Sequence, residues 1–143
     1  MPSHSERKML PYSRDQMFDL VSDVGRYQEF LPWCVGTRVR SSNETLMVAD
    51  MIIGFKAFRE TFTSRVNLQR PDRIDVAYQD GPFKHLTNRW IFEQAGNDAT
   101  TVDFHVDFEF RSRILEKAIG VVFGQAVERM VGAFEKRARD LYG

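Results

Sequence analysis

The stretch TVDFHVDFEF, residues 101–110, alternates apolar and polar side chains at every step. Successive side chains of a β-strand point to opposite faces, so this pattern predicts a strand with one buried face and one wet face. The apolar side chains are those of Val102, Phe104, Val106, Phe108 and Phe110, and the polar ones are those of Thr101, Asp103, His105, Asp107 and Glu109. We expect this strand over residues 99–111, with a core rich in aromatic rings.

After this strand the apolar period changes from 2 to 3.6. Apolar side chains recur at every third or fourth position from Leu115 to Leu141, with charged side chains between them. This spacing predicts one amphipathic helix of about thirty residues, roughly 45 Å long at about 1.5 Å per residue. Gly120 and Gly124 lie one turn apart inside it, and each costs about 1 kcal/mol relative to alanine. Close contact with the sheet, a bend, or room left for a ligand would each account for them.

The chain before residue 99 carries the same period of two, interrupted by turn residues. Strands are predicted at 35–42, 45–54, 57–69, 73–79 and 84–95. Because the links are short and rich in Gly, Pro, Asn and Asp, successive strands should pair as an antiparallel meander.

The N-terminal part predicts a strand followed by two short helices. Residues 3–10 form the strand. Ser13 and Gln16 have the spacing of a capping box, so a helix should begin there and end at Gly25. A second short helix is predicted at 27–31 and is ended by the following proline.

Together these elements predict an α+β fold. A curved antiparallel sheet of about seven strands would surround one long C-terminal helix, with two short helices after the first strand. The length of 143 residues suits a single domain with one core, spanning residues 1–143.

The composition excludes several classes of protein. Twenty Lys and Arg balance twenty Asp and Glu, whereas nucleic-acid-binding proteins usually carry a basic excess. No run of about 18 apolar residues is present, and the N-terminal residues lack the apolar segment of a secretory signal. One cysteine excludes an internal disulfide, which fits a reducing compartment. We therefore expect a cytoplasmic protein that does not bind DNA.

The aromatic face of the predicted sheet also carries three polar side chains, those of Glu60, Ser64 and Asn88. Glu60 needs an explanation, because a buried carboxylate without a partner is costly. It could lie near a strand end and reach water or an arginine. It could line a cavity and orient a ligand's head group, or the strand could be shifted by one residue.

Motifs for catalysis and metal binding are absent from the sequence. It has no His-x-x-x-His or Cys-x-x-Cys spacing, no glycine-rich phosphate loop and no G-x-S-x-G motif. Asp103, His105 and Asp107 share a strand face and could touch a cation, but a polar row on a wet face looks the same. Cys34 has apolar neighbours, which raise the pKa of a thiol, so a structural or pocket-lining role is expected. The sequence therefore predicts no enzyme and no metal site.

Segments along nearly the whole chain match one family in order. They are Pro11-Tyr12-Ser13, 16–21, Phe30-Leu31-Pro32-Trp33-Cys34, Gly54-Phe55-Lys56, Arg59-Glu60, 62–66, 80–84, 108–110, Ala133-Phe134, Arg137-Ala138 and Leu141-Tyr142-Gly143. With them the chain resembles the coenzyme Q-binding START-domain family of polyketide cyclase-like proteins. That family is closely related to the bacterial ribosome-association toxin family. The resemblance implies the helix-grip fold of START and Bet v 1 proteins.

The resemblance also implies a function. A hydrophobic cavity between sheet and helix would bind ubiquinone or a similar polyisoprenoid lipid, and the protein would act as a carrier or chaperone that supports respiratory electron transfer. Ubiquinone would be the bound ligand, and no cofactor would be required. Mitochondrial members carry a targeting presequence that this chain lacks, which implies a bacterial protein. It would act in the cytoplasm, with peripheral contact to the cytoplasmic face of the inner membrane or to respiratory complexes.

The predicted faces assign residues to this cavity. The lining would comprise Phe58, Glu60, Phe62, Trp90, Phe104, Phe108, Val122, Phe123 and Met130. The mouth or lid would comprise Phe30, Leu31, Trp33, Phe55 and Phe83. Glu60 is the candidate polar contact. The segment RYQEFLPWCVG, residues 26–36, would be a lid with an apolar inner face, and Trp33 would turn either inward to the lipid or outward to a membrane or partner.

A large dry cavity would be costly. At about 24 cal/mol per Å³, a cavity of about 300 Å³ would cost roughly 7 kcal/mol, comparable to the net stability of a whole domain. We therefore expect the ligand-free protein to have a partly collapsed pocket, a mobile lid or a co-purified lipid.

The related toxin family implies an alternative function, which is binding to the large ribosomal subunit to block subunit joining. Both families share most of the matching segments, so these segments separate the two functions poorly. The balanced charge argues against an RNA partner, since phosphate contacts need Lys and Arg. A local basic patch could still serve, formed by Arg38, Arg40, Arg59, Arg65 and Lys84.

Overall fold

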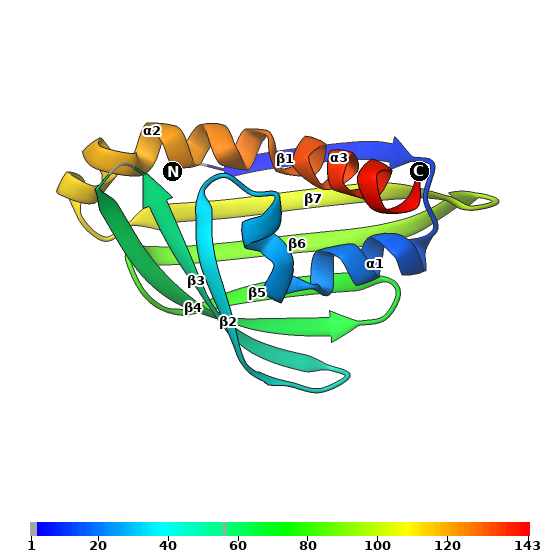
Figure 1. Cartoon of the computed structure of the whole chain (residues 1–143), viewed down its shortest axis with the longest axis horizontal. Helices are drawn as coiled ribbons and strands as arrows, with labels where there is room; N and C mark the ends of the chain where they lie inside the picture. Colours follow the sequence, from blue (N-terminus) through cyan, green and yellow to red (C-terminus); the bar gives the residue numbers. More distant parts are fainter. Residues whose placement is uncertain (1–2, 56) are drawn as a thin grey trace.

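Seven antiparallel strands form one curved sheet in the computed structural model, which describes residues 3–55 and 57–143 (Figure 1). The strands are β1 Ser3–Leu10, β2 Cys34–Ser42, β3 Leu46–Phe55, β4 Phe58–Gln69, β5 Arg73–Asp80, β6 Phe83–Gly96 and β7 Ala99–Phe110. Each predicted strand is confirmed, with its ends within one residue of the prediction. Lys56, which belongs to one of the matching segments, lies outside the described residues.

The first strand of the chain pairs with the last one. The strand order is β1-β7-β6-β5-β4-β3-β2, so β1 adds to the outer edge of β7 and places Glu6 opposite Phe104. The other strands form the predicted meander. Figure 1 shows the helices lying together across one face of this sheet.

The alternation of β7 places its aromatic side chains in the core, as predicted. Trp90 of β6 lies opposite Phe104, and Leu86 lies opposite Phe108, so these four side chains share one face. All four are buried. The polar side chains of β7 are half-buried on the other face. The sheet therefore presents one apolar, aromatic face to the helices.

Four helical segments cover that face. They are α1 Arg14–Ser22, the 3₁₀ helix η1 Val24–Glu29, α2 Arg113–Glu128 and α3 Met130–Tyr142. The two short helices after the first strand are confirmed, but their boundary differs from the prediction. α1 ends at Ser22, and η1 runs through Gly25, which was expected to end α1. Among the described residues, no helix is long and apolar enough to cross a membrane.

The prediction of one unbroken C-terminal helix is wrong, because the helix breaks at Arg129. This residue has φ −99° and ψ 4°, and its N–H points to the carbonyls of Gln125 and Ala126, at 3.2 Å each. α2 packs on β7, whereas α3 packs on α1. The apolar stripe gives no sign of the break, because both halves keep the same period.

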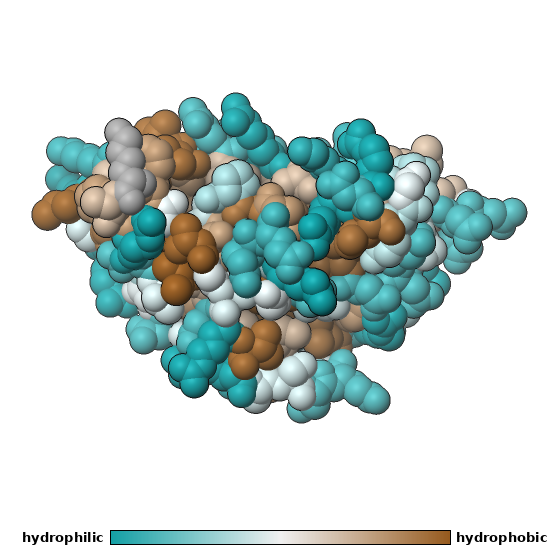
Figure 2. All heavy atoms as spheres, viewed as in Figure 1, coloured by the Kyte–Doolittle hydropathy of each residue, from teal (hydrophilic) through white to brown (hydrophobic). Residues whose placement is uncertain are grey.

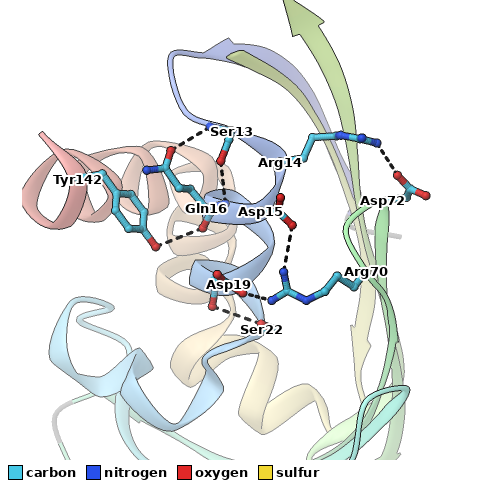
Figure 3. Close-up of polar contacts among 9 residues, drawn as sticks. All are labelled: Ser13, Arg14, Asp15, Gln16, Asp19, Ser22, Arg70, Asp72 and Tyr142. Carbon is cyan, nitrogen blue, oxygen red and sulfur yellow. Dashed lines mark hydrogen bonds and ion pairs between the residues drawn. The ribbon is translucent and has the colours of Figure 1, made fainter. Parts of the chain in front are cut away.

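Polar contacts hold α1 in place (Figure 3). The hydroxyl of Ser13 accepts from the N–H of Gln16 at 3.1 Å, and the Gln16 side chain accepts from the N–H of Ser13 at 3.0 Å, which confirms the capping box. Arg70, from the turn between β4 and β5, donates to Asp15 at 3.1 Å and also to Asp19. Because exposed ion pairs contribute at most about 1 kcal/mol, these contacts mainly set the position of α1 over the sheet.

Gly124 of α2 allows a test of how closely this helix packs on its neighbours. A Cβ added at Gly124 would meet no heavy atom within 4 Å, so close contact with the sheet does not require this glycine. Gly124→Ala should therefore raise the free energy of unfolding by about 0.5–1 kcal/mol, because alanine favours the helix. Denaturant unfolding measures the change.

Gly81→Ala is the comparison variant, for which we expect the opposite effect on stability. Gly81 has φ +143°, and an added Cβ would lie 2.6 Å from the Cβ of Phe62. This variant should lose stability. A Gly124→Ala variant that unfolds more easily than the wild type would contradict the open space described beside α2.

Candidate functional site

An inner cavity of about 70 Å³ lies between the apolar face of the sheet and the helices. Eighteen side chains line it, and they come from α1, η1, strands β3 to β7, α2, α3 and the segment before β2. At about 24 cal/mol per Å³, a void of this size costs only about 1.7 kcal/mol. The cavity is about half as large as one that holds benzene, at about 150 Å³. A partly collapsed pocket, a mobile lid or a co-purified lipid was expected, and a cavity this small agrees with the first of these.

The lining is almost entirely apolar. None of the described residues that line the cavity is Asp, Glu, His, Cys, Lys or Arg. The hydroxyl of Tyr27 donates to the carbonyl of Val21, and burial raises the pKa of this phenol above its ordinary range. It therefore stays neutral at any ordinary pH. The cavity offers no acid, base or nucleophile to a bound molecule.

Three further lining side chains carry a nitrogen or oxygen atom. Trp90 Nε1 donates to Asn88 Oδ1 at 3.1 Å, and Asn88 Nδ2 donates to the carbonyl of His105 at 2.9 Å. The amide of Asn88 is thus held by its own neighbours. The indole N–H of Trp33 is buried and has no hydrogen-bond partner in the described structure.

A larger groove of about 890 Å³ lies outside the cavity. One wall is the segment 30–33 with the end of β3, and the other is formed by α2 and α3. Its rim is charged: Arg137 donates to Glu29 at 2.6 Å and lies over the ring of Phe30, at 5.1 Å from its centroid. On the face of the molecule seen in Figure 2, hydrophobic residues lie between hydrophilic ones. Trp33 lines both the groove and the cavity, so it separates them.

The predicted lining residues divide into two groups. Phe62, Trp90, Phe104, Phe123 and Met130 line the inner cavity, as the sequence patterns placed them. They come from three strands and both C-terminal helices. The structure thus brings together five side chains that lie as far as 68 positions apart, from position 62 to position 130.

Four predicted lining residues lie elsewhere. Val122 faces the outer groove, because it lies one helical step of about 100° from Phe123. Phe108 is buried in the core and packs on Phe123, with 5.0 Å between ring centroids. Phe58 is 41% exposed at the end of the β3–β4 hairpin. Glu60 is half-buried near the same end and lines neither the cavity nor the groove.

The predicted mouth is mostly found in the outer groove. Phe30, Leu31, Trp33 and Phe55 line this groove, and Trp33 turns inward, since it is only 8% exposed. Phe83 is a correction: it is fully buried rather than at the mouth. A bulge at the start of β6, between residues 83 and 85, shifts the register there, and the ring of Phe83 packs in the core.

Some lining residues were missed. Met51, Val66 and Ile74 lie on the inner face of their strands, and strand alternation could have found them. Val24 and Tyr27 of η1 could not be found in this way, because a short 3₁₀ helix has no sustained period.

The polar row of β7 was the sequence's candidate for contact with a cation. Asp103, His105 and Asp107 lie on the outer face, where His105 Nδ1 is 2.6 Å from the hydroxyl of Ser5. Among the described residues, no group of three or more His, Cys, Asp or Glu side chains could hold a metal ion.

Comparison with known proteins gives sequence relatives along the whole chain. A family profile described as polyketide cyclase / dehydrase and lipid transport matches residues 10–135. "Ribosome association toxin RatA" of Escherichia coli K12 is 39% identical over 99% of this chain and 90% of its own length. "Coenzyme Q-binding protein COQ10 homolog B, mitochondrial" of Xenopus laevis is 35% identical over 98% of this chain and 59% of its own length.

Solved structures share the fold. An 18 kDa protein from Caulobacter crescentus is 38% identical, with a TM-score of 0.74 over 100% of this chain and 99% of that one. A START superfamily protein from Mycobacterium smegmatis has a TM-score of 0.79 at 18% identity, over 97% and 98% of the two chains. The ZhuI aromatase/cyclase of Streptomyces has a TM-score of 0.76 at 16% identity, over 96% and 93% of the two chains. The last two likenesses concern the fold alone.

Cys34 follows Trp33 in the sequence but lines neither the cavity nor the groove, and the reactivity of its thiol can be tested. Burial raises the pKa of its thiol to about 11, and a backbone hydrogen bond at Gly36 acts in the opposite direction. At pH 8 about one thiol in a thousand would be ionised, compared with about one in four for an ordinary thiol of pKa about 8.5. Alkylation by iodoacetamide, followed by mass spectrometry, should therefore be at least about a hundredfold slower than for free cysteine.

The alkylation rate of Cys34 should increase with pH. Because the thiolate reacts, the rate for Cys34 should still rise about tenfold per pH unit at pH 9, where free cysteine levels off. Protein unfolded in guanidinium is the control and should react at the ordinary rate. Fast alkylation of the folded protein at pH 7 would contradict the inert role assigned to this thiol.

Proposed function

Because the chain belongs to the polyketide cyclase, dehydrase and lipid transport family, we propose that it binds a hydrophobic small molecule of the ubiquinone type in its inner cavity. It would carry this molecule in support of respiratory electron transfer and catalyse no reaction on it. The observation that carries the proposal is the aromatic lining without an acid, base or nucleophile. Such a lining retains a flat apolar molecule, and burial of each methylene contributes about 0.8 kcal/mol.

Binding requires the cavity to enlarge. A volume of about 70 Å³ is too small for a substituted ring, so side chains must move when a ligand enters. The ligand would enter through the wall that the cavity shares with the outer groove, and Trp33 forms part of this wall. Met130, directly after the helix break, is half-buried on another part of the lining and has the flexible side chain that adapts to different shapes. The groove then leaves room for an isoprenoid tail.

Native mass spectrometry of protein purified from its own host tests this function. The proposal expects a bound lipid, which extraction and mass analysis would identify as a quinone or related polyisoprenoid. The sharper test is Val127→Phe, which fills the cavity from α2 without adding charge. This variant should lower the affinity for a short-chain ubiquinone by at least about tenfold, or about 1.4 kcal/mol.

Leu115→Phe is the matched control, because Leu115 is half-buried on the same helix but does not line the cavity. It should retain the quinone. Equal retention by both variants, measured by titration on folded protein, would rule out the inner cavity as the binding site.

A second candidate function is ribosome association, which the relatives named as toxins favour. RatA-named proteins of several bacteria are 36–39% identical to this chain. On the outer face of β2 to β4, Arg40 is paired with Asp50 at 2.8 Å, whereas Arg38 and Arg65 are exposed and form no ion pair within the described residues. These two guanidinium groups could meet RNA phosphates.

The other members of the predicted basic patch are engaged. Arg59 donates to the carbonyl of Phe58 at 2.8 Å, and Lys84 lies 4.0 Å from Glu109. Arg38 and Arg65 are therefore the members of the predicted patch that form no hydrogen bond or ion pair with other groups of the described residues. A contact through Arg38 and Arg65 alone should be weak and strongly dependent on salt.

Co-sedimentation with ribosomes tests this candidate. If it holds, the protein should pellet with the large subunit at low salt, and Arg38→Glu/Arg65→Glu should abolish this. The control is Arg113→Glu/Lys117→Glu, which changes the net charge by the same amount but at residues of α2. Failure of the wild type to pellet at low salt, or equal pelleting of both double variants, would eliminate this surface.

A further inference from the structure

The indole N–H of Trp33 is a buried hydrogen-bond donor at the cavity that no group of the described residues satisfies. Among the described lining residues, the polar atoms of Tyr27, Asn88 and Trp90 are all engaged by protein groups. Trp33 is 8% exposed, and its Nε1 is buried without a partner. Buried donors without an acceptor are rare in folded proteins, so this one points to a group that the bound state supplies.

The position of Trp33 is fixed by its surroundings. Its carbonyl accepts from the N–H of Gly54 at 2.9 Å, and the next residue, Cys34, donates its N–H to Leu31 at 3.0 Å. Its ring packs edge-on against Phe123, with 5.8 Å between centroids. The indole is therefore held against α2 at the boundary between the cavity and the groove.

The chemistry of this donor restricts the ligand. An indole N–H can only donate, so its complement is an acceptor oxygen. A carboxylate or an ammonium group would be buried among apolar side chains without a counter-charge, which is very costly. A hydroxyl could also accept from this N–H, but it would bring a proton that needs an acceptor of its own. A neutral carbonyl satisfies the donor and brings no proton that would itself need an acceptor.

We propose that the ligand is a neutral, flat, conjugated ring whose carbonyl oxygen accepts a hydrogen bond from Trp33 Nε1. This inference rests on the proposed function and adds the chemical group that is recognised and the atom that recognises it. The carbonyl lies at the groove side of the cavity, because Trp33 lines both spaces. The hydroxyl of Ser64 is also buried without a partner, but Ser64 does not line the cavity and is not part of this contact.

Two probes of the same shape test the proposal. Menadione, 2-methyl-1,4-naphthoquinone, and 2-methylnaphthalene share a fused ring and a methyl group, but only menadione has carbonyl oxygens. Their dissociation constants would be measured for wild type and for Trp33→Phe. In Trp33→Phe, the affinity for menadione relative to that for 2-methylnaphthalene should fall by about tenfold, because the variant lacks the hydrogen-bond donor.

The comparison variant is Trp90→Phe, because the N–H of Trp90 already donates to Asn88. It removes an indole from the same cavity and should change the ratio of affinities much less. An equal shift in both variants would overturn the proposal, because it would assign the effect to the loss of ring volume.

Nuclear magnetic resonance of the wild type provides a measurement that does not depend on the stability of any variant. The chain has two tryptophans, so two indole N–H signals are expected. Menadione should move the Trp33 indole proton downfield as the hydrogen bond forms, and 2-methylnaphthalene should not. If both probes bind without a downfield shift, this inference fails and the hydrophobic cavity stands. If neither probe binds, the proposed function and this inference fail together.

Discussion

The packing of two phenylalanines, one on each C-terminal helix, is the interaction on which the rest of the structure depends. Phe123 of α2 contacts the rings of Trp33, Phe83, Phe108 and Phe110, with centroid distances of 5.0–5.8 Å. Phe134 of α3 contacts Tyr27, Phe30 and Trp90 at 5.0–5.3 Å. Each aromatic pair contributes about 0.5–1.5 kcal/mol beyond its buried area. The two side chains thus anchor the helices to the sheet at two separate places.

The cavity and the helix break both lie between these anchors. Phe123 and Phe134 line the cavity from its two sides, and Arg129 lies between them in sequence. A small void remains between the helical layer and the sheet, beside both rings. The break also shortens the rigid unit that a ligand must displace. The rings that anchor the helices to the sheet therefore also bound the cavity.

The architecture was largely predictable from the sequence, and the reason is physical. Strand alternation such as that of TVDFHVDFEF determines which side chains face the core, and a capping box determines where α1 begins. Those rules placed Phe62, Trp90 and Phe104 in the cavity. They failed where the backbone departs from a regular period. The bulge before residue 85 buried Phe83, and the hairpin end exposed Phe58. The break at Arg129 leaves the apolar stripe unchanged, so no pattern could reveal it.

The central claim is that a hydrophobic ring occupies the space between the two aromatic anchors. Nuclear Overhauser contacts between the methyl protons of bound menadione and the protein test it most directly. The account predicts contacts to the rings of Phe123, Phe134 and Trp90 together, which line the cavity from α2, α3 and β6. Contacts confined to exposed side chains such as Val121 or Phe58 would contradict it, because they would place the ligand on the outer surface.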